Sequence, residues 1–238
     1  MENKICIAND FIEGNLELTI DELYVFSHLW TLRTYENKVI TSIDILNEII
    51  ELLAVKKRNK ARIKATLSSI QDKQVINIQE KGKALVITFN EVGKDGCIFV
   101  PYEKVKELSP IDFFIYVAVA KWENPKKGTK AKYSYLKWAE LLDCTEKTAV
   151  KYVNSAIEKG VIFKSVGSYN KEKSVERKEK SYIMQEINVY STVPFLIPKP
   201  KIEETAKEMA EDVQANELQE VEEKAVATDQ KEIVQAPV

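Results

Sequence analysis

The sequence predicts an α+β fold of two similar units, each with three helices followed by a β-hairpin, and an acidic segment after them. Helix and strand patterns occur twice in the same order, and the composition changes where prolines cluster at residues 194–200. Apolar residues recur every three to four positions in the predicted helices, and β-rich runs flank turn residues in the predicted hairpins. We place the first unit at residues 1–98, the second at 99–197 and a disordered acidic tail at 198–238.

The first unit begins with a helix at Thr19-Ile-Asp-Glu22, where the Thr and Glu side chains can each accept from the other's backbone N–H. A second helix is expected from about residue 41 and a third over 57–72. Strand-like runs at 75–78 and 84–89 flank a turn at Gly82, which predicts a hairpin. The expected inward residues of the first and third helices are Leu23, Phe26, Leu29, Trp30, Ile63, Leu67 and Ile70.

The second unit repeats this order. Ser109 precedes a proline at the first helical position, a second helix follows from Ser134, and Thr145 caps a third. Strand-like runs at 161–166 and 182–189 enclose a long charged loop. The third helices match at a constant offset of 86 residues, which indicates a duplication. The matched pairs are Ile63/Ala149, Leu67/Val153, Ile70/Ala156 and Ile76/Ile162.

The charge is distributed unevenly along the chain. Residues 201–238 hold four lysines and eleven acids, so this segment carries −7, whereas the rest of the chain carries +5. The segment has no aromatic residue and few large aliphatic ones, so it cannot bury enough surface to offset the entropy of ordering. It could serve as a solubilising extension, as a segment that docks on a partner, or as a competitor of nucleic acid for basic helices.

Features of catalytic and cofactor sites are scarce. His28 is the one histidine, predicted in mid-helix, and the seven glycines form no phosphate-binding loop. The three cysteines are widely spaced and form no CxxC motif, so we interpret them as reduced packing residues. Residues 1–15 do not read as a signal peptide, and the longest apolar run, 113–120, is too short to span a bilayer. We therefore expect a cytoplasmic protein with no enzymatic activity, metal or cofactor.

The start of the third predicted helix is strongly basic. No acid lies between Glu51 and Asp72, and six cations within nine residues repel one another unless a polyanion neutralises them. They lie at a helix N-terminus, where backbone donors favour phosphate. The alternative is a solvated lysine-rich helix. The candidate DNA-binding residues of the first unit are Lys56, Lys57, Arg58, Lys60, Arg62 and Lys64, with Lys81 and Lys83 at the hairpin tip.

The third helix of the second unit offers donors and short polar groups of the kind that contact base edges and phosphates. Its candidate residues are Thr145, Lys147, Thr148, Lys151, Asn154 and Ser155. The charged loop at 170–181 could track a phosphate backbone or could be a plain disordered loop. Its candidate residues are Lys171, Lys173, Arg177 and Lys178.

Three helices followed by a hairpin is the order of a winged helix-turn-helix unit. The segment from Thr145 to Ile162, with Gly160 suited to a left-handed helix end, resembles the recognition-helix region of winged-helix DNA-binding families. Gln74 departs from this pattern in the first unit. The two-unit layout is similar to replication initiators of Gram-positive plasmids and phages and to the N-terminal module of DnaD-type primosome proteins. The resemblance covers about residues 15–190.

The resemblance implies sequence-specific binding of double-stranded DNA, with origin recognition and recruitment of host replication proteins, the acidic tail being one candidate contact. A transcriptional regulator would use the same surfaces. A tandem winged-helix protein-interaction module, as in chromosome-condensation accessory proteins, would be expected to lack the basic cluster at 56–64. A homodimer is left open, and no membrane contact is expected.

Overall fold

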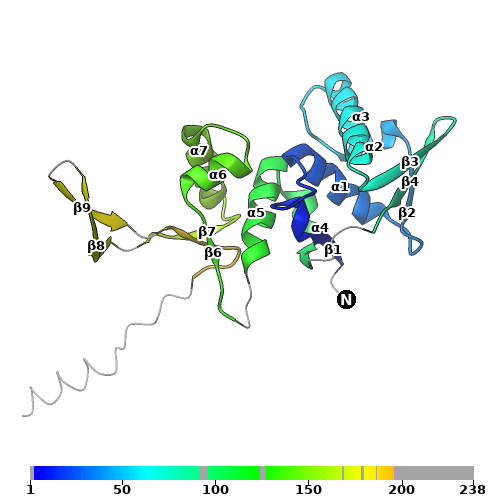
Figure 1. Cartoon of the computed structure of the whole chain (residues 1–238). Coiled ribbons are helices and arrows are strands. Elements are labelled where there is room, and N and C mark those ends of the chain that lie inside the picture. Colours follow the sequence, from blue (N-terminus) through cyan, green and yellow to red (C-terminus); the bar gives the residue numbers. More distant parts are fainter. Residues whose placement is uncertain are drawn as a thin grey trace, which may run out of the picture. The chain divides into compact units, whose positions relative to one another are not determined.

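The structure is a computed structural model that describes residues 3–91, 96–123, 127–167, 169–177, 180–185 and 187–195. It is a mixed α+β fold with small antiparallel sheets (Figure 1). Residues 1–195 form one compact unit. The acidic tail expected over residues 198–238 lies outside the described residues, as does Lys178.

The first half contains a three-stranded sheet, two long helices and a short helix between them. The sheet has the order β2-β4-β3, so the predicted hairpin is joined by a strand from the connection between the first two helices. The elements are β1 (Lys4–Ala8), a 3-10 turn (Asn9–Phe11), α1 (Ile20–Leu32), β2 (Lys38–Thr41), α2 (Ile43–Ile49), α3 (Lys56–Asp72), β3 (Ile76–Lys81) and β4 (Ala84–Phe89).

The second half repeats the arrangement of two long helices with a short one between them, followed by a strand pair. Its sheet has the order β6-β10-β7, and β8 pairs with β9 in a separate two-stranded ribbon. Residues 170–177 and 180–181 of the predicted charged loop thus lie in a strand pair. The elements are β5 (Cys97–Pro101), α4 (Tyr102–Glu107), α5 (Pro110–Trp122), β6 (Ala131–Lys132), α6 (Tyr135–Leu141), α7 (Glu146–Glu158), β7 (Phe163–Ser165), β8 (Tyr169–Arg177), β9 (Lys180–Gln185) and β10 (Val189–Ser191).

The helix starts predicted from capping residues are confirmed. Thr19 and Glu22 form the reciprocal capping box of α1, with the Thr19 N–H donating to the Glu22 carboxylate at 2.7 Å. Ser109 accepts from the backbone N–H of Asp112 at the start of α5, and Thr145 does the same for Thr148 at the start of α7. Each cap satisfies an N–H that has no partner inside its own helix.

The expected inward faces of α1, α3 and α7 are also confirmed, with Trp30 half-buried and the other residues fully buried. The second helix differs from its sequence pattern. α2 ends at Ile49, and Ile45 and Ile49 are exposed, because the helix presents only its Leu46 side to the core. The strands β1, β2, β5 and β6 and the helix α4 were not predicted, since elements of six residues or fewer leave a weak periodic signal.

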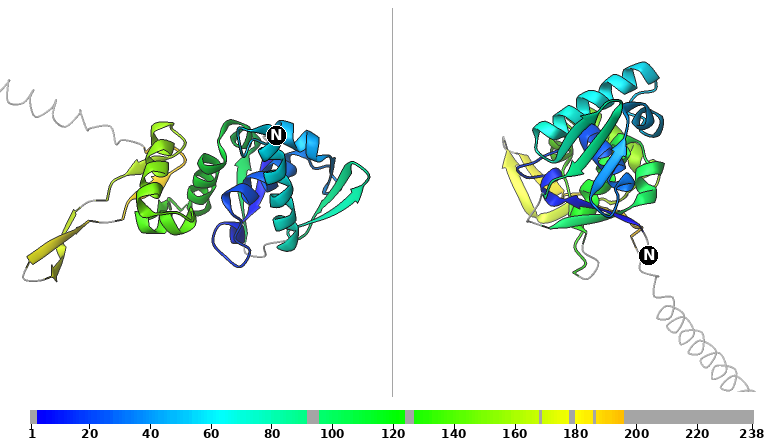
Figure 2. Two further views of the ribbon diagram at one scale, coloured as in Figure 1. Left: turned by 90° about the horizontal axis from the view of Figure 1, so that it is seen from above. Right: turned by 90° about the vertical axis from the view of Figure 1, so that its right-hand side faces the viewer.

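The two halves share one core. The predicted boundary between residues 98 and 99 falls inside β5, which pairs antiparallel with β1 at the start of the chain. α1 of the first half packs against α5 of the second, and both lie in the middle of the described unit with α3 on one flank and α7 on the other (Figures 1 and 2). Buried side chains from both halves form a single apolar cluster.

Candidate nucleic-acid interface

The six cations predicted at the start of α3 are all exposed to solvent. α3 begins at Lys56, and its N-cap residue, Val55, provides no side-chain acceptor for the first-turn N–H groups. Exposed cations thus surround a helix N-terminus whose backbone donors are not capped by a side chain. Both features favour an anion at this position.

Three of these six cations are paired with carboxylates from other helices. Lys56 lies 3.3 Å from the Glu48 carboxylate, Lys60 forms an ion pair with Asp44, and Arg62 Nε lies 2.5 Å from Asp21 Oδ2. These pairs connect α3 to α2 and to the start of α1. The sequence predicted six unneutralised cations because the segment between Glu51 and Asp72 contains no acid. In the structure this prediction holds for only three of the six. A partner such as Asp21 could not be identified from the sequence, because it lies 41 residues away from Arg62.

The other three cations, Lys57, Arg58 and Lys64, form no ion pair with any residue that the structure describes. An exposed cation without a carboxylate partner keeps its full charge for an external anion. The polyanion-binding capacity of α3 is therefore concentrated on these three side chains.

Asn59, in the middle of the basic run, has a structural role that sequence reasoning missed. Its side chain is 1% exposed, and its Oδ1 accepts from the backbone N–H groups of Leu52 and Leu53 at 2.8 and 2.9 Å. Its Nδ2 donates to the Ile50 carbonyl at 2.7 Å. These bonds fix the α2–α3 connection and hence the start of α3. The available signal was its spacing: residues 59, 63, 67 and 70 share one helix face.

A groove of about 470 Å³ separates α3 from the β3–β4 hairpin. Lys64 of α3 and Lys83 of the hairpin line it, as does the turn residue Gly82, whose φ is 64°. One carboxylate, Glu80, lies in the same groove and opposes an anionic ligand. The other lining residues are Ile43, Leu67, Ser68, Gln71, Ile78 and Leu85. Lys81 is exposed beside the turn. The structure thus brings one predicted helix cation, Lys64, and one predicted hairpin cation, Lys83, to the same concave surface.

The candidate residues of α7 divide into two kinds. Thr145 and Thr148 serve the helix start, with their hydroxyl oxygens 2.9 Å apart and the Thr148 N–H bonded to Thr145 Oγ1. Lys147, Lys151 and Asn154 are exposed and have no side-chain partner within the described part of the chain, and Ser155 is half-buried. Three of the six predicted residues therefore present free polar groups on one helix. Lys171, Lys173 and Arg177 lie on β8.

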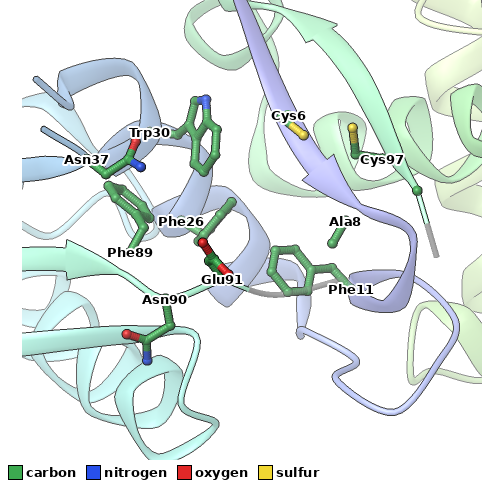
Figure 3. A pocket seen from close by; sticks show the side chains of 11 residues that line it. Cys6, Ala8, Phe11, Phe26, Trp30, Asn37, Phe89, Asn90, Glu91 and Cys97 are labelled. Carbon is green, nitrogen blue, oxygen red and sulfur yellow. The ribbon is translucent and has the colours of Figure 1, made fainter. Parts of the chain in front are cut away.

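A second cavity, of about 540 Å³, lies away from these surfaces and contains none of the predicted site residues. Figure 3 shows its aromatic walls, made by Phe11, Phe26, Trp30 and Phe89, and the thiols of Cys6 and Cys97 on neighbouring strands. Burial, with a smaller contribution from the neighbouring Cys97 thiol, raises the pKa of the Cys6 thiol to about 12. A thiol with so high a pKa is a poor nucleophile. All three cysteines are free.

His28 is buried on α1, with its ring 4.6 Å from that of Tyr24. Burial, with a smaller contribution from the charge of Lys106, lowers its pKa to about 4. Its Nε2 has no hydrogen-bond partner in the described structure. These properties are those of a neutral packing residue.

Within the described ranges, no group of three or more His, Cys, Asp or Glu side chains is arranged to hold a metal ion. None of the helices found there is both long and apolar enough to cross a lipid bilayer. No protein-family model matches the chain, and comparison with curated proteins gives no match.

Proposed function

We propose that this chain is a tandem winged-helix protein that binds double-stranded DNA in a sequence-specific manner. The observation that carries the proposal is the set of exposed, unpaired cations at the uncapped start of α3, next to a groove whose far side carries Lys83. An unpaired cation contributes more to DNA affinity than a paired one, because it can neutralise a phosphate without giving up an internal ion pair.

The element order supports the winged-helix assignment. In each half a capped first helix, a short second helix and a longer third helix precede an antiparallel strand pair. The third helices α3 and α7 take the position of recognition helices, and the β3–β4 and β8–β9 pairs take the position of wings.

α3 and α7 are suited to different parts of DNA recognition. α3 carries mostly Lys and Arg, which contact phosphates without reading sequence. α7 presents Asn154 beside Lys151, and Asn can form two hydrogen bonds with adenine in the major groove. We infer that α3 mainly supplies affinity and α7 mainly supplies specificity.

The narrower proposal is a plasmid or phage replication initiator that recognises an origin and recruits host replication proteins without catalysis. It rests on the similarity of the two-unit layout to such initiators. Recovery of origin DNA with the protein from its native replicon would support it, whereas recovery of promoter DNA alone would point to a regulator.

The experiment that tests DNA binding is a salt titration with a random duplex. Among the candidate cations whose side chains the structure describes, seven have no ion-pair partner there: Lys57, Arg58, Lys64, Lys81, Lys83, Lys147 and Lys151. If each neutralises one phosphate, log affinity should fall against log salt with a slope of about −6. Absence of binding at low salt, or a slope near zero, would overturn the proposal.

A further inference from the structure

A salt bridge connects α3 to α1 in the first half. Lys73, which follows the last residue of α3, donates to Glu22 at the start of α1 with an N–O distance of 2.7 Å. The Glu22 side chain is 4% exposed and also accepts from Ser69 Oγ at 2.5 Å. The hydrogen bonds from Lys73 and Ser69 hold the pKa of this carboxyl below its usual value against the opposing effect of burial. A buried carboxylate with several donors resists displacement of the helix that provides them.

The second half contains the corresponding salt bridge. Lys159, which follows the last residue of α7, donates to Asp112 at the start of α5 at 2.7 Å. The Asp112 side chain is 6% exposed and also accepts from Ser109 Oγ at 2.7 Å. The end of each third helix is therefore held on the start of the first helix of its own half.

The two first helices are held together by buried contacts. The rings of Tyr24 on α1 and Phe113 on α5 lie 5.9 Å apart, and Tyr24 Oη donates to the Leu108 carbonyl at 3.1 Å. Outside this core, the Glu13 carboxylate of the first half lies 3.4 Å from Lys121 Nζ and 3.2 Å from Lys137 Nζ of the second. The contacts form an unbroken series from α3 through α1 and α5 to α7.

We propose that this series fixes the spacing and orientation of α3 and α7, so that the protein recognises a bipartite duplex site with one invariant separation between its two parts. The inference rests on the proposed function and extends it to the form of the target. Independent movement of the two helices would require leaving the buried carboxylates of Glu22 and Asp112 without their lysine partners, or opening the Tyr24–Phe113 contact. An unpaired buried carboxylate and an opened core contact are both costly. A chain connection alone would impose no such restriction.

The first test maps the two contacted segments by hydroxyl-radical protection of a duplex that the full chain has selected from a random library. The phosphates contacted by α3 are those whose protection is lost in Lys57→Ala and Arg58→Ala, and the base pairs read by α7 are those whose substitution lowers affinity. Because α3 contacts phosphates without reading sequence, a rigid chain should keep the α3 protection at one separation from the α7 base pairs when 5 or 10 bp are inserted between the segments. Protection spread over several separations would overturn the inference, because a flexible connection between the halves would produce it.

The second test measures the spacing in the protein itself. Spin labels are placed on the exposed positions Ala65 of α3 and Glu158 of α7, as Ala65→Cys and Glu158→Cys in a chain whose three native cysteines are serines. A melting curve first verifies that this chain folds. If the series of contacts holds, the distance distribution is narrow and unchanged by DNA. A broad distance distribution, or one that DNA shifts, would overturn this inference without affecting the proposal of DNA binding. A narrow distribution in a protein that binds no DNA would instead overturn the proposed function.

Discussion

Gln74 has the same left-handed backbone conformation as Gly160, its counterpart 86 residues later, with φ values of 58° and 69°. Both residues follow a third helix, and the hydrogen bonds around them repeat at the same offset. Val75 N–H donates to the Ile70 carbonyl at 3.2 Å, and Val161 N–H donates to the Ala156 carbonyl at 2.9 Å. The two helix ends therefore use one backbone arrangement, although the sequence provides glycine in only one of them.

This arrangement predicts opposite effects for exchanges at the two positions. Gly160→Ala should lower the free energy of unfolding by about 1–2 kcal/mol, the cost of the left-handed region for an L-residue. Open space surrounds the added Cβ, so no clash contributes. Gln74→Gly should raise stability by up to about 1 kcal/mol. Urea unfolding measures both, and Gly160→Asn is the control because Asn tolerates this conformation better. Equal losses for Ala and Asn would contradict the explanation.

The free energy of unfolding should decrease as the pH is lowered from 6.5 to 4, because of His28. Its pKa is about 4 in the folded chain and 6.5 unperturbed, so the unfolded chain binds more protons in this window. The loss should reach about 3 kcal/mol near pH 4, at up to about 1.4 kcal/mol per pH unit. His28→Phe should flatten the dependence between pH 6.5 and 5, above the range in which carboxylates titrate. Parallel curves for the two proteins in urea unfolding would show that another group is responsible.

Substitutions should separate the contributions of α3 and α7 to DNA binding. Lys57→Ala, Arg58→Ala and Lys64→Ala should each weaken binding to every duplex and reduce the salt slope by about 1. Lys151→Ala and Asn154→Ala should instead cost about 1–3 kcal/mol on the selected site and little on random DNA. Competition titrations with both duplexes measure the difference.

Two further variants serve as controls for this division. Lys104→Ala removes a cation of α4, outside both candidate surfaces, and should leave binding unchanged. Glu80→Gln removes the carboxylate of the α3–hairpin groove and should strengthen binding. If the α3 and α7 variants behaved alike, the division of roles would be wrong.

Deletion of residues 201–238 should leave the melting midpoint unchanged within error, because this segment contains few apolar side chains to bury. It removes a charge of −7 and leaves a +5 chain, which should bind random DNA more tightly at low salt. The gain should shrink as salt screens charges beyond about 8–10 Å. Binding to the selected site should gain less, since base contacts are short-ranged.

The comparison uses intact and shortened chains on a random duplex at two salt concentrations. Equal affinities at low salt would exclude an electrostatic role for the tail. A lower melting midpoint would show that the segment contributes to the fold.

Local signals in the sequence were sufficient for the three helices of each predicted unit and for their capped starts, but not for the six-residue α4. Thr19, Ser109 and Thr145 cap the helices that they were expected to cap, because a side-chain oxygen next to an uncapped N–H acts within four residues. The buried faces of α3 and α7 and their offset of 86 residues followed from the helix period alone.

The partners of the basic residues depended on tertiary structure. Lys56, Lys60 and Arg62 are indistinguishable in sequence from Lys57, Arg58 and Lys64, yet only the first three meet carboxylates from α1 and α2. The pairing of β1 with β5 and the Tyr24–Phe113 contact likewise join segments about 90 residues apart.

The sequence by itself determined the first and third helices of each half, their apolar faces and where the chain is basic or acidic, because capping, periodicity and composition are properties of neighbouring residues. Only the tertiary structure decided which cations remain unpaired and that the two halves share one core. Ion pairs and core contacts depend on which surfaces the folded chain brings together, and no local pattern encodes a partner such as Asp21 for Arg62 or Leu108 for Tyr24.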